Sequence, residues 1–84
     1  MKQIAVGDLE IRVTGTREEG FVAVEQLTGM FGEGDDQAEA LSDVLRSLYF
    51  LLTDLEEHRE RLSSPLAAQW RALTRSLPRD FSGA

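Results

Sequence analysis

The sequence contains no cysteine, only two prolines and a single histidine in 84 residues. The absence of cysteine excludes a disulfide framework and thiolate metal sites, and it suits a reducing cytoplasm. No apolar run approaches the roughly 18–20 residues that a membrane span requires, and the opening residues MKQIAVGDLE hold no apolar segment of signal-peptide length. We therefore expect a cytoplasmic chain that does not cross a membrane.

The length allows one small domain, which we place over residues 1–84. A chain of this size buries only about 60–65% of its extended surface on folding, so its stability is thin and self-association is a common remedy. Hydrophobic residues make up 42% of the chain and charged residues 29%, which is ordinary for a globular protein. Wholesale disorder is not expected.

Charge is distributed unevenly along the chain. Residues 1–58 carry 13 acids against four bases, whereas residues 59–84 carry five arginines against two acids. The net charge of the whole chain is −6. Because most of such a surface repels phosphate, direct nucleic-acid binding is disfavoured, and a basic protein partner is better matched.

Hydrophobic alternation at the start of the chain predicts strands. Leu9, Ile11 and Val13 alternate with polar residues, which is the pattern of a half-buried strand. Residues 3–6 form either a separate strand, joined through Gly7-Asp8 by a hairpin turn, or the first part of one long strand with a bulge at that glycine. The pattern does not separate these two alternatives.

Two further strands follow a turn-like segment at residues 15–20. Residues 21–24 (FVAV) are apolar at consecutive positions, so this strand should be central in the sheet and covered on both faces. Another short strand is predicted around residues 30–33, where Gly32 weakens the strand or marks a bulge. The sheet as a whole is expected over about residues 3–34.

The strongest helix signal covers residues 36–62, which contain neither glycine nor proline. Asp36 followed by Glu39 is a capping-box arrangement at the start of this segment. Arg59 falls on the centre of the apolar stripe, so we expect the last two turns to overhang the sheet. The stripe itself consists of Leu41, Val44, Leu45, Leu48, Leu52 and Leu55.

A second, shorter helix is predicted over residues 65–77, with Ser64 as its cap and Pro65 at the first helical position. It covers either the free face of its own sheet or that of a neighbouring subunit, and we favour the first. Its apolar side chains are Leu66, Trp70, Leu73 and Leu77. The predicted fold class is α+β: a small antiparallel sheet of three to four strands packed on one long helix, plus a short C-terminal helix.

The order of these parts carries a family resemblance. A strand opens at Gly20-Phe21-Val22, and a turn with Leu27 and Gly29 follows. The approach to the long helix contains Gly34, Asp35, Glu39, Ala40 and Leu41. Over roughly residues 9–60, this arrangement resembles the HicB-type antitoxin domain. The resemblance implies a small sheet backed by a helix, similar to a trimmed RNase H-like fold without nuclease activity.

The same resemblance implies a function. Members of the family neutralise a small basic toxin that cleaves RNA by covering its active site, and they commonly self-associate. Thr28 stands where the family usually has proline, and Pro65 begins a helix where the family usually adds a strand. We predict a non-catalytic, HicB-like protein-binding module that forms a homodimer; the alternative is a stand-alone oligomeric scaffold or adaptor without a toxin partner.

The polar residues are not expected to form a catalytic, cofactor or metal site. A hydrolase with RNase H-like chemistry needs several carboxylates converging on a rigid sheet. His58 has Glu57 beside it and Asp54 one turn back, but it lacks a nucleophile or a second imidazole, so we predict a surface role. The carboxylates predicted to be solvated or to cap elements are Asp8, Glu10, Glu18, Glu19, Glu25, Glu33, Asp35 and Asp36.

Phe50 is the main candidate for an interface. On the helical wheel it lies opposite the leucine stripe, beside Arg46 and with Tyr49 at the border. Aromatic residues are enriched in protein interfaces, and an exposed phenylalanine on a rigid helix fits that role. Trp70, on the second predicted helix, packs either in the core or in an interface. The predicted interface residues are therefore Arg46, Tyr49, Phe50 and Trp70.

Overall fold

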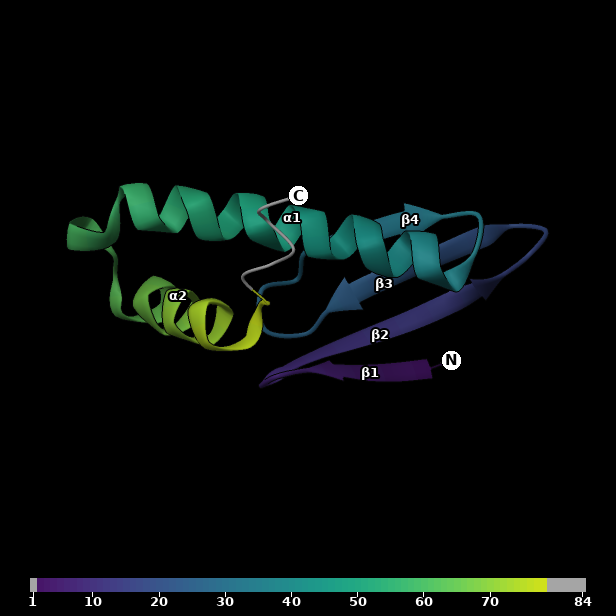
Figure 1. Cartoon of the computed structure of the whole chain (residues 1–84), viewed down its shortest axis with the longest axis horizontal. Coiled ribbons are helices and arrows are strands. Elements are labelled where there is room, and N and C mark those ends of the chain that lie inside the picture. Colours follow the sequence, from purple (N-terminus) through teal and green to yellow (C-terminus); the bar gives the residue numbers. More distant parts are fainter. Residues whose placement is uncertain (1, 79–84) are drawn as a thin grey trace.

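The computed structural model describes residues 2–78 and has an α+β architecture, as predicted. Its elements are β1 (Lys2–Val6), β2 (Leu9–Thr16), β3 (Gly20–Glu25), β4 (Phe31–Gly34), α1 (Gln37–Glu57), a 3-10 turn (Arg59–Arg61) and α2 (Ser64–Ser76). The strands form one antiparallel sheet in the order β1-β2-β3-β4, and α1 packs along it (Figure 1).

The first two strands form a hairpin, which decides between the two predicted alternatives. β1 and β2 pair antiparallel with Val6 opposite Leu9, so only Gly7 and Asp8 make the turn. Gly7 has φ +59°, a left-handed conformation that glycine adopts without the steric penalty of a Cβ atom. A two-residue turn of this kind matches the twist of the strands that it joins.

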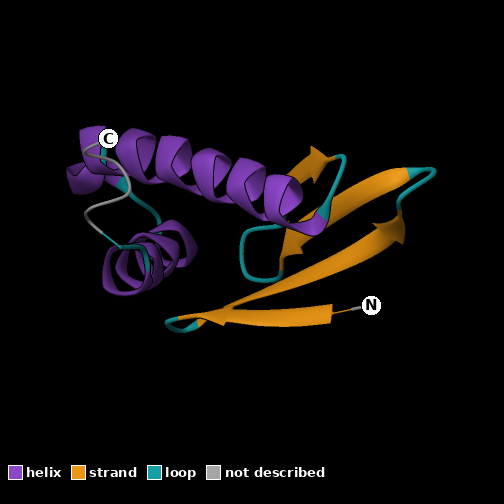
Figure 2. Cartoon of the chain, turned by 45° about the vertical axis from the view of Figure 1, so that its right-hand side comes forward, coloured by secondary structure: helices purple, strands orange, loops and turns teal. Residues whose placement is uncertain are grey.

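The sheet has an inner face, which the helices cover, and an outer face, which they do not (Figure 2). Cross-strand partners share a face, so Val13, Ala23 and Gly32 lie on the inner face. The outer face presents Gln3, Ala5, Glu10, Arg12, Thr14, Val22, Val24, Phe31 and Glu33. β3 is central, as predicted, but the expected cover on its second face is not found within residues 2–78.

Glycines in β4 allow the backbone of α1 to pack closely on the sheet. A Cβ atom on Gly32 would lie 2.2 Å from the backbone nitrogen of Val44, and one on Gly34 would lie 2.4 Å from the Cβ atom of Glu39. The pairing of β3 with β4 continues through Gly32 without interruption. The predicted bulge at this glycine is therefore wrong, and the missing side chain makes room for the helix backbone.

The start of α1 confirms the predicted cap. The backbone N–H of Glu39 donates to Oδ1 of Asp36 over 2.7 Å, and the N–H of Asp35 donates to Oε1 of Glu39 over 3.0 Å. These two bonds satisfy backbone donors that have no partner within the helix itself.

The end of α1 corrects the prediction, because the helix stops at Glu57 and not at residue 62. His58 leaves helical geometry with φ −116° and ψ 23°, and its N–H donates to the carbonyl of Leu55. A continued helix would have placed Arg59 on the apolar stripe. The turn instead leaves Arg59 exposed and directs the half-buried Leu62 toward the core.

The second helix packs against the first and not against the outer face of the sheet. Leu73 and Leu77 form one buried cluster with Leu48 and Leu55 of α1 and with Leu9 of β2. α1 extends past the sheet, and α2 runs antiparallel beneath this overhang (Figure 1). The expectation that α2 covers the free face of its own sheet is therefore wrong; α2 completes the core at the end of the sheet.

The beginning of α2 also differs slightly from the prediction. The capping residue is Ser63, and its side chain makes no capping hydrogen bond. Ser64 is the first helical residue, which leaves Pro65 at the second position, where its missing N–H costs no helical hydrogen bond. The helix ends one residue early, at Ser76.

The core consists of two clusters that meet in the middle of the molecule. One joins α1 to α2 around Leu48 and Leu73, and the other joins α1 to the sheet around Ile11 and Val44. Val6 and Leu45 pack against both clusters.

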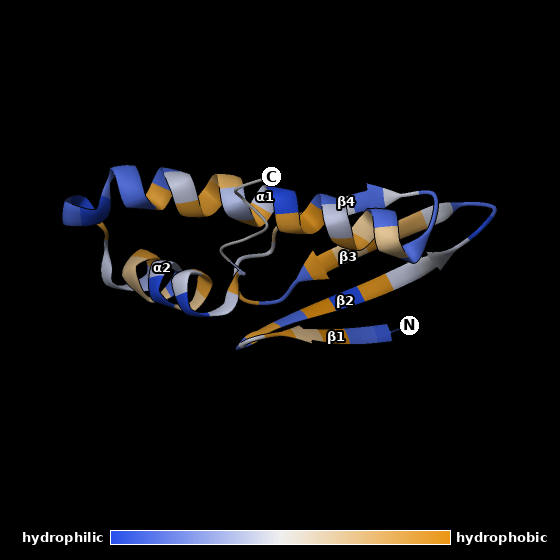
Figure 3. Ribbon diagram, viewed as in Figure 1, coloured by the Kyte–Doolittle hydropathy of each residue, from blue (hydrophilic) through white to orange (hydrophobic). Residues whose placement is uncertain are grey.

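Both helices alternate apolar and polar stripes (Figure 3), and within residues 2–78 neither of them combines the length and the apolar character that a bilayer crossing requires.

Candidate interaction surfaces

The solvent-facing side of α1 brings together three of the four predicted interface residues. Phe50 is 71% exposed, as the helical wheel predicts. Arg46, one turn earlier, is exposed, and its Nη1 atom lies 3.7 Å from Oδ1 of Asp43. Tyr49 is half-buried, and its hydroxyl donates to the carbonyl of Pro78. We call Arg46, Tyr49 and Phe50 the α1 surface.

Trp70 lies elsewhere, on α2, where it packs at the edge of the α1–α2 cluster. The Arg59 guanidinium lies 5.8 Å from the centroid of its ring, within the range of a cation–π contact. The indole Nε1 atom is buried and has no hydrogen-bond partner among the described residues. This position fits the core role that we considered for Trp70 better than membership of the α1 surface.

The outer face of the sheet carries an apolar patch that the sequence analysis did not identify as a site. Phe31 is 59% exposed, and Val22 and Val24 are half-buried beside it. Arg12 and Glu33, both exposed, border these residues across the strands. We call Val22, Val24 and Phe31 the outer-face patch. The signal is present in the consecutive apolar residues FVAV, which predict cover on both faces of the strand, by the second helix of the same chain or by that of a neighbouring subunit.

Glu25 is buried and not solvated, so of the two roles predicted for the carboxylates, solvated or capping, it has the capping one. Its side chain is fully buried on the inner face, at the end of β3. Oε2 accepts the N–H of Leu27 over 2.7 Å, while Oε1 accepts the N–H of Thr28 over 2.8 Å and its hydroxyl over 2.6 Å. Glu25 therefore organises the β3–β4 turn, and the other seven carboxylates are exposed as predicted.

Several of the exposed carboxylates line two shallow hollows at the end of the sheet near the start of α1. The larger hollow, of about 650 Å³, lies against Arg17, Phe21 and Asp36, and the smaller, of about 340 Å³, lies against Glu19 and Phe21. Phe21 and Asp35 line both hollows. Arg17 stands among the acids of the larger hollow, whereas the charged residues of the smaller one are all acids: Glu19, Glu33 and Asp35. The smaller hollow, with Phe21 and Val22 beside these acids, is therefore the one suited to the stem and the cation of a basic side chain.

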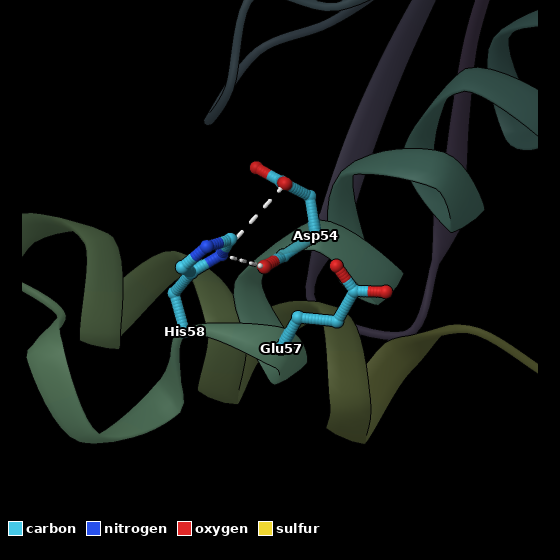
Figure 4. Close-up of side chains that lie close together, drawn as sticks. All are labelled: Asp54, Glu57 and His58. Carbon is cyan, nitrogen blue, oxygen red and sulfur yellow. Dashed lines mark hydrogen bonds and ion pairs between the residues drawn. The ribbon is translucent and has the colours of Figure 1, made fainter.

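The end of α1 carries an exposed group of polar side chains (Figure 4). Nδ1 of His58 lies 3.0 Å from the backbone carbonyl oxygen of Asp54 and 3.8 Å from its Oδ1. Together with Glu57, these residues bring one ligand atom each within 4.8 Å of one another. Zinc ligands lie about 2.0–2.2 Å from the metal, so the three groups would have to close further to share an ion. All three are exposed, and the predicted surface position of His58 is confirmed.

Comparison of the chain with known proteins finds no matching family model, no matching curated protein and no matching solved structure. The resemblance to the HicB-type antitoxin domain therefore stays a prediction that depends on the residues quoted above.

Proposed function

We propose that this chain is a non-catalytic, cytoplasmic protein-binding module of the HicB type, which masks a small basic protein that cleaves RNA and which also associates with itself. The proposal depends on the quoted family resemblance and on surfaces suited to protein contacts.

The observation that carries the proposal is the position of Phe50. Complete burial of a phenylalanine side chain contributes about 1.5–3 kcal/mol. Phe50 is 71% exposed on a helix, so a partner that covers it would gain most of this free energy. Its neighbour on the preceding turn, Arg46, and the half-buried Tyr49 enlarge the contact area. Side chains of these types are enriched among the residues that dominate binding energies.

Charge supports the choice of a basic partner. The exposed acids of α1 include Glu39, Asp54, Glu56 and Glu57, and the hollows at the end of the sheet add Asp35. An acidic surface increases the encounter rate with a basic protein, and the effect falls as salt is added. A basic ribonuclease is therefore better suited to this surface than RNA itself.

The test is inhibition of RNA cleavage by the partner. A tagged copy is purified from its own host at low salt, and any small basic protein that accompanies it is identified by mass spectrometry and purified alone. We expect the partner to cleave RNA and the wild-type chain to stop cleavage at about one equivalent. The Phe50→Glu variant should stop cleavage only at a concentration at least about tenfold higher, because the substitution replaces a buried apolar contact with a charge.

Thr74→Glu is the matched control, since it adds the same charge at an exposed position on α2. It should inhibit cleavage as well as the wild-type chain does. If the chain is recovered without any basic partner at low salt, the masking role is wrong. Recovery of a homo-oligomer alone would then favour the alternative function, an oligomeric scaffold or adaptor.

A further inference from the structure

The outer face of the sheet is too apolar for a surface that faces only water. In a two-layer protein, the uncovered face of an antiparallel sheet normally carries polar side chains. Here Val22 and Val24 of β3 stand beside Phe31 of β4, with Val24 directly opposite Phe31 in the register. Both helices lie on the inner side, so among the described residues nothing covers this patch.

The charges beside the patch have an arrangement that fits a two-fold axis. Arg12 is in register with Val24, and Glu33 is in register with Val22, so these two charges lie diagonally across the patch. Strand spacing and rise place their Cα atoms about 12 Å apart. Among residues 2–78, the two side chains form no ion pair with each other. A two-fold operation that exchanges the two positions sets Arg12 of each copy opposite Glu33 of the other.

We propose that the outer face of the sheet binds the same face of a second copy of this chain. Val22, Val24 and Phe31 of the two copies pack together, and two reciprocal Arg12–Glu33 ion pairs fix the orientation. The inference deepens the self-association part of the proposed function and rests on it, but it does not depend on the basic partner. It places self-association on the sheet and leaves the α1 surface open for other contacts.

The size of the face sets the expected affinity. Four strands at about 4.8 Å spacing and some five residues at about 3.3 Å rise give a projected area on the order of 300 Å² per copy. A standard interface buries about 800 Å² per partner, so this contact is small. We expect a reversible dimer with a Kd of about 10–100 µM, not a permanent one.

Sedimentation velocity of the purified chain tests the proposal across about 5 µM to about 500 µM, a range that brackets this Kd. The wild-type chain should pass from monomer to dimer over this range. Val24→Lys should stay monomeric, because it places a charge in the centre of the patch. Val24→Thr, which keeps the side-chain shape, should raise the Kd at least about fivefold while leaving the far-UV circular dichroism spectrum unchanged.

Charge reversal provides an independent test that a folding defect cannot imitate. Arg12→Glu and Glu33→Arg should each raise the dimer Kd about fivefold to tenfold, because each sets like charges against one another. The double variant should return the Kd to within about twofold of the wild-type value, since it restores both ion pairs with their signs exchanged. Thr74→Glu, which adds a charge at an exposed position of α2 outside both surfaces, serves as the control and should dimerise like the wild-type chain.

Three results would overturn the inference: a wild-type chain that stays monomeric at the highest concentration, a dimer that survives Val24→Lys, or a dimer lost in Phe50→Glu. Its failure can be told apart from failure of the proposed masking role. A monomeric wild-type chain that still inhibits RNA cleavage removes only the sheet-face dimer. A dimer broken by Val24→Lys in a chain that has no basic partner removes only the masking role.

Discussion

At the scale of single residues, Glu25 is the one carboxylate among residues 2–78 that is fully buried. Its two oxygens accept three hydrogen bonds from Leu27 and Thr28 while the side chain itself is fully buried. A buried carboxylate is tolerated only when its hydrogen-bonding capacity is used, and here the backbone of the β3–β4 turn uses it. This turn positions β4, on which α1 packs.

Removal of this carboxylate should therefore destabilise the whole domain. We expect Glu25→Ala to lower the free energy of unfolding by about 3 kcal/mol, because it leaves two backbone N–H groups and a hydroxyl without their charged acceptor. Urea titration followed by circular dichroism measures the change. Glu10→Ala, an exposed acid on β2, is the control and should change stability by less than about 0.5 kcal/mol. Equal effects at the two positions would contradict the assigned role.

At the scale of elements, α2 covers the part of α1 that extends past the sheet. Leu55 would lie in solvent beyond the edge of the sheet, but it is 4% exposed because Leu73 and its neighbours cover it. The end of α2 is also tied to the β1–β2 turn, where the N–H of Asp8 donates to Oγ of Ser76 over 2.9 Å. An ion pair of 2.7 Å between Asp8 and Arg75 lies beside it, on the surface.

Two leucines of α2 provide a matched pair for testing this packing. Leu73 is completely buried, whereas Leu66 is 40% exposed. Leu73→Ala should lower the free energy of unfolding by about 2–5 kcal/mol, through lost burial and the cavity that remains. Leu66→Ala should change it by less than about 1 kcal/mol, since alanine also favours the helix. Thermal or urea unfolding of both variants gives the comparison, and similar losses would argue against docking of α2 in this position.

At the scale of the whole molecule, the chain is elongated, with extents of 44 × 26 × 18 Å, because α1 runs past the sheet. Elongation alone favours independent unfolding of the two ends. The two buried clusters are nevertheless connected, since Val6 and Leu45 pack against both of them. We therefore expect α2 and the sheet to unfold as one cooperative unit.

The single tryptophan allows a direct test of this cooperativity. Trp70 lies on α2, so its fluorescence reports on that helix, while far-UV circular dichroism reports on the entire chain. We expect the two urea transitions to coincide in midpoint and steepness, as they do for a two-state domain. A fluorescence midpoint at clearly lower urea would mean that α2 undocks before the sheet unfolds.

The sequence alone predicted most of the local structure. Alternation identified β2, the leucine stripe identified α1, and Asp36 with Glu39 marked where that helix begins. The exposure of Phe50 also followed from the helical period. These features depend on residues close together in the chain, where side-chain periodicity reports directly on which face is buried.

Tertiary structure alone decided the remaining features. It buried Glu25, ended α1 at His58, used Gly32 for close packing, and docked α2 on α1 so that the outer-face patch stayed open. In each case, the deciding neighbour is distant in the sequence. Periodicity indicates that an apolar face must be covered. Which segment covers that face depends on how all the helices and strands of the chain pack together.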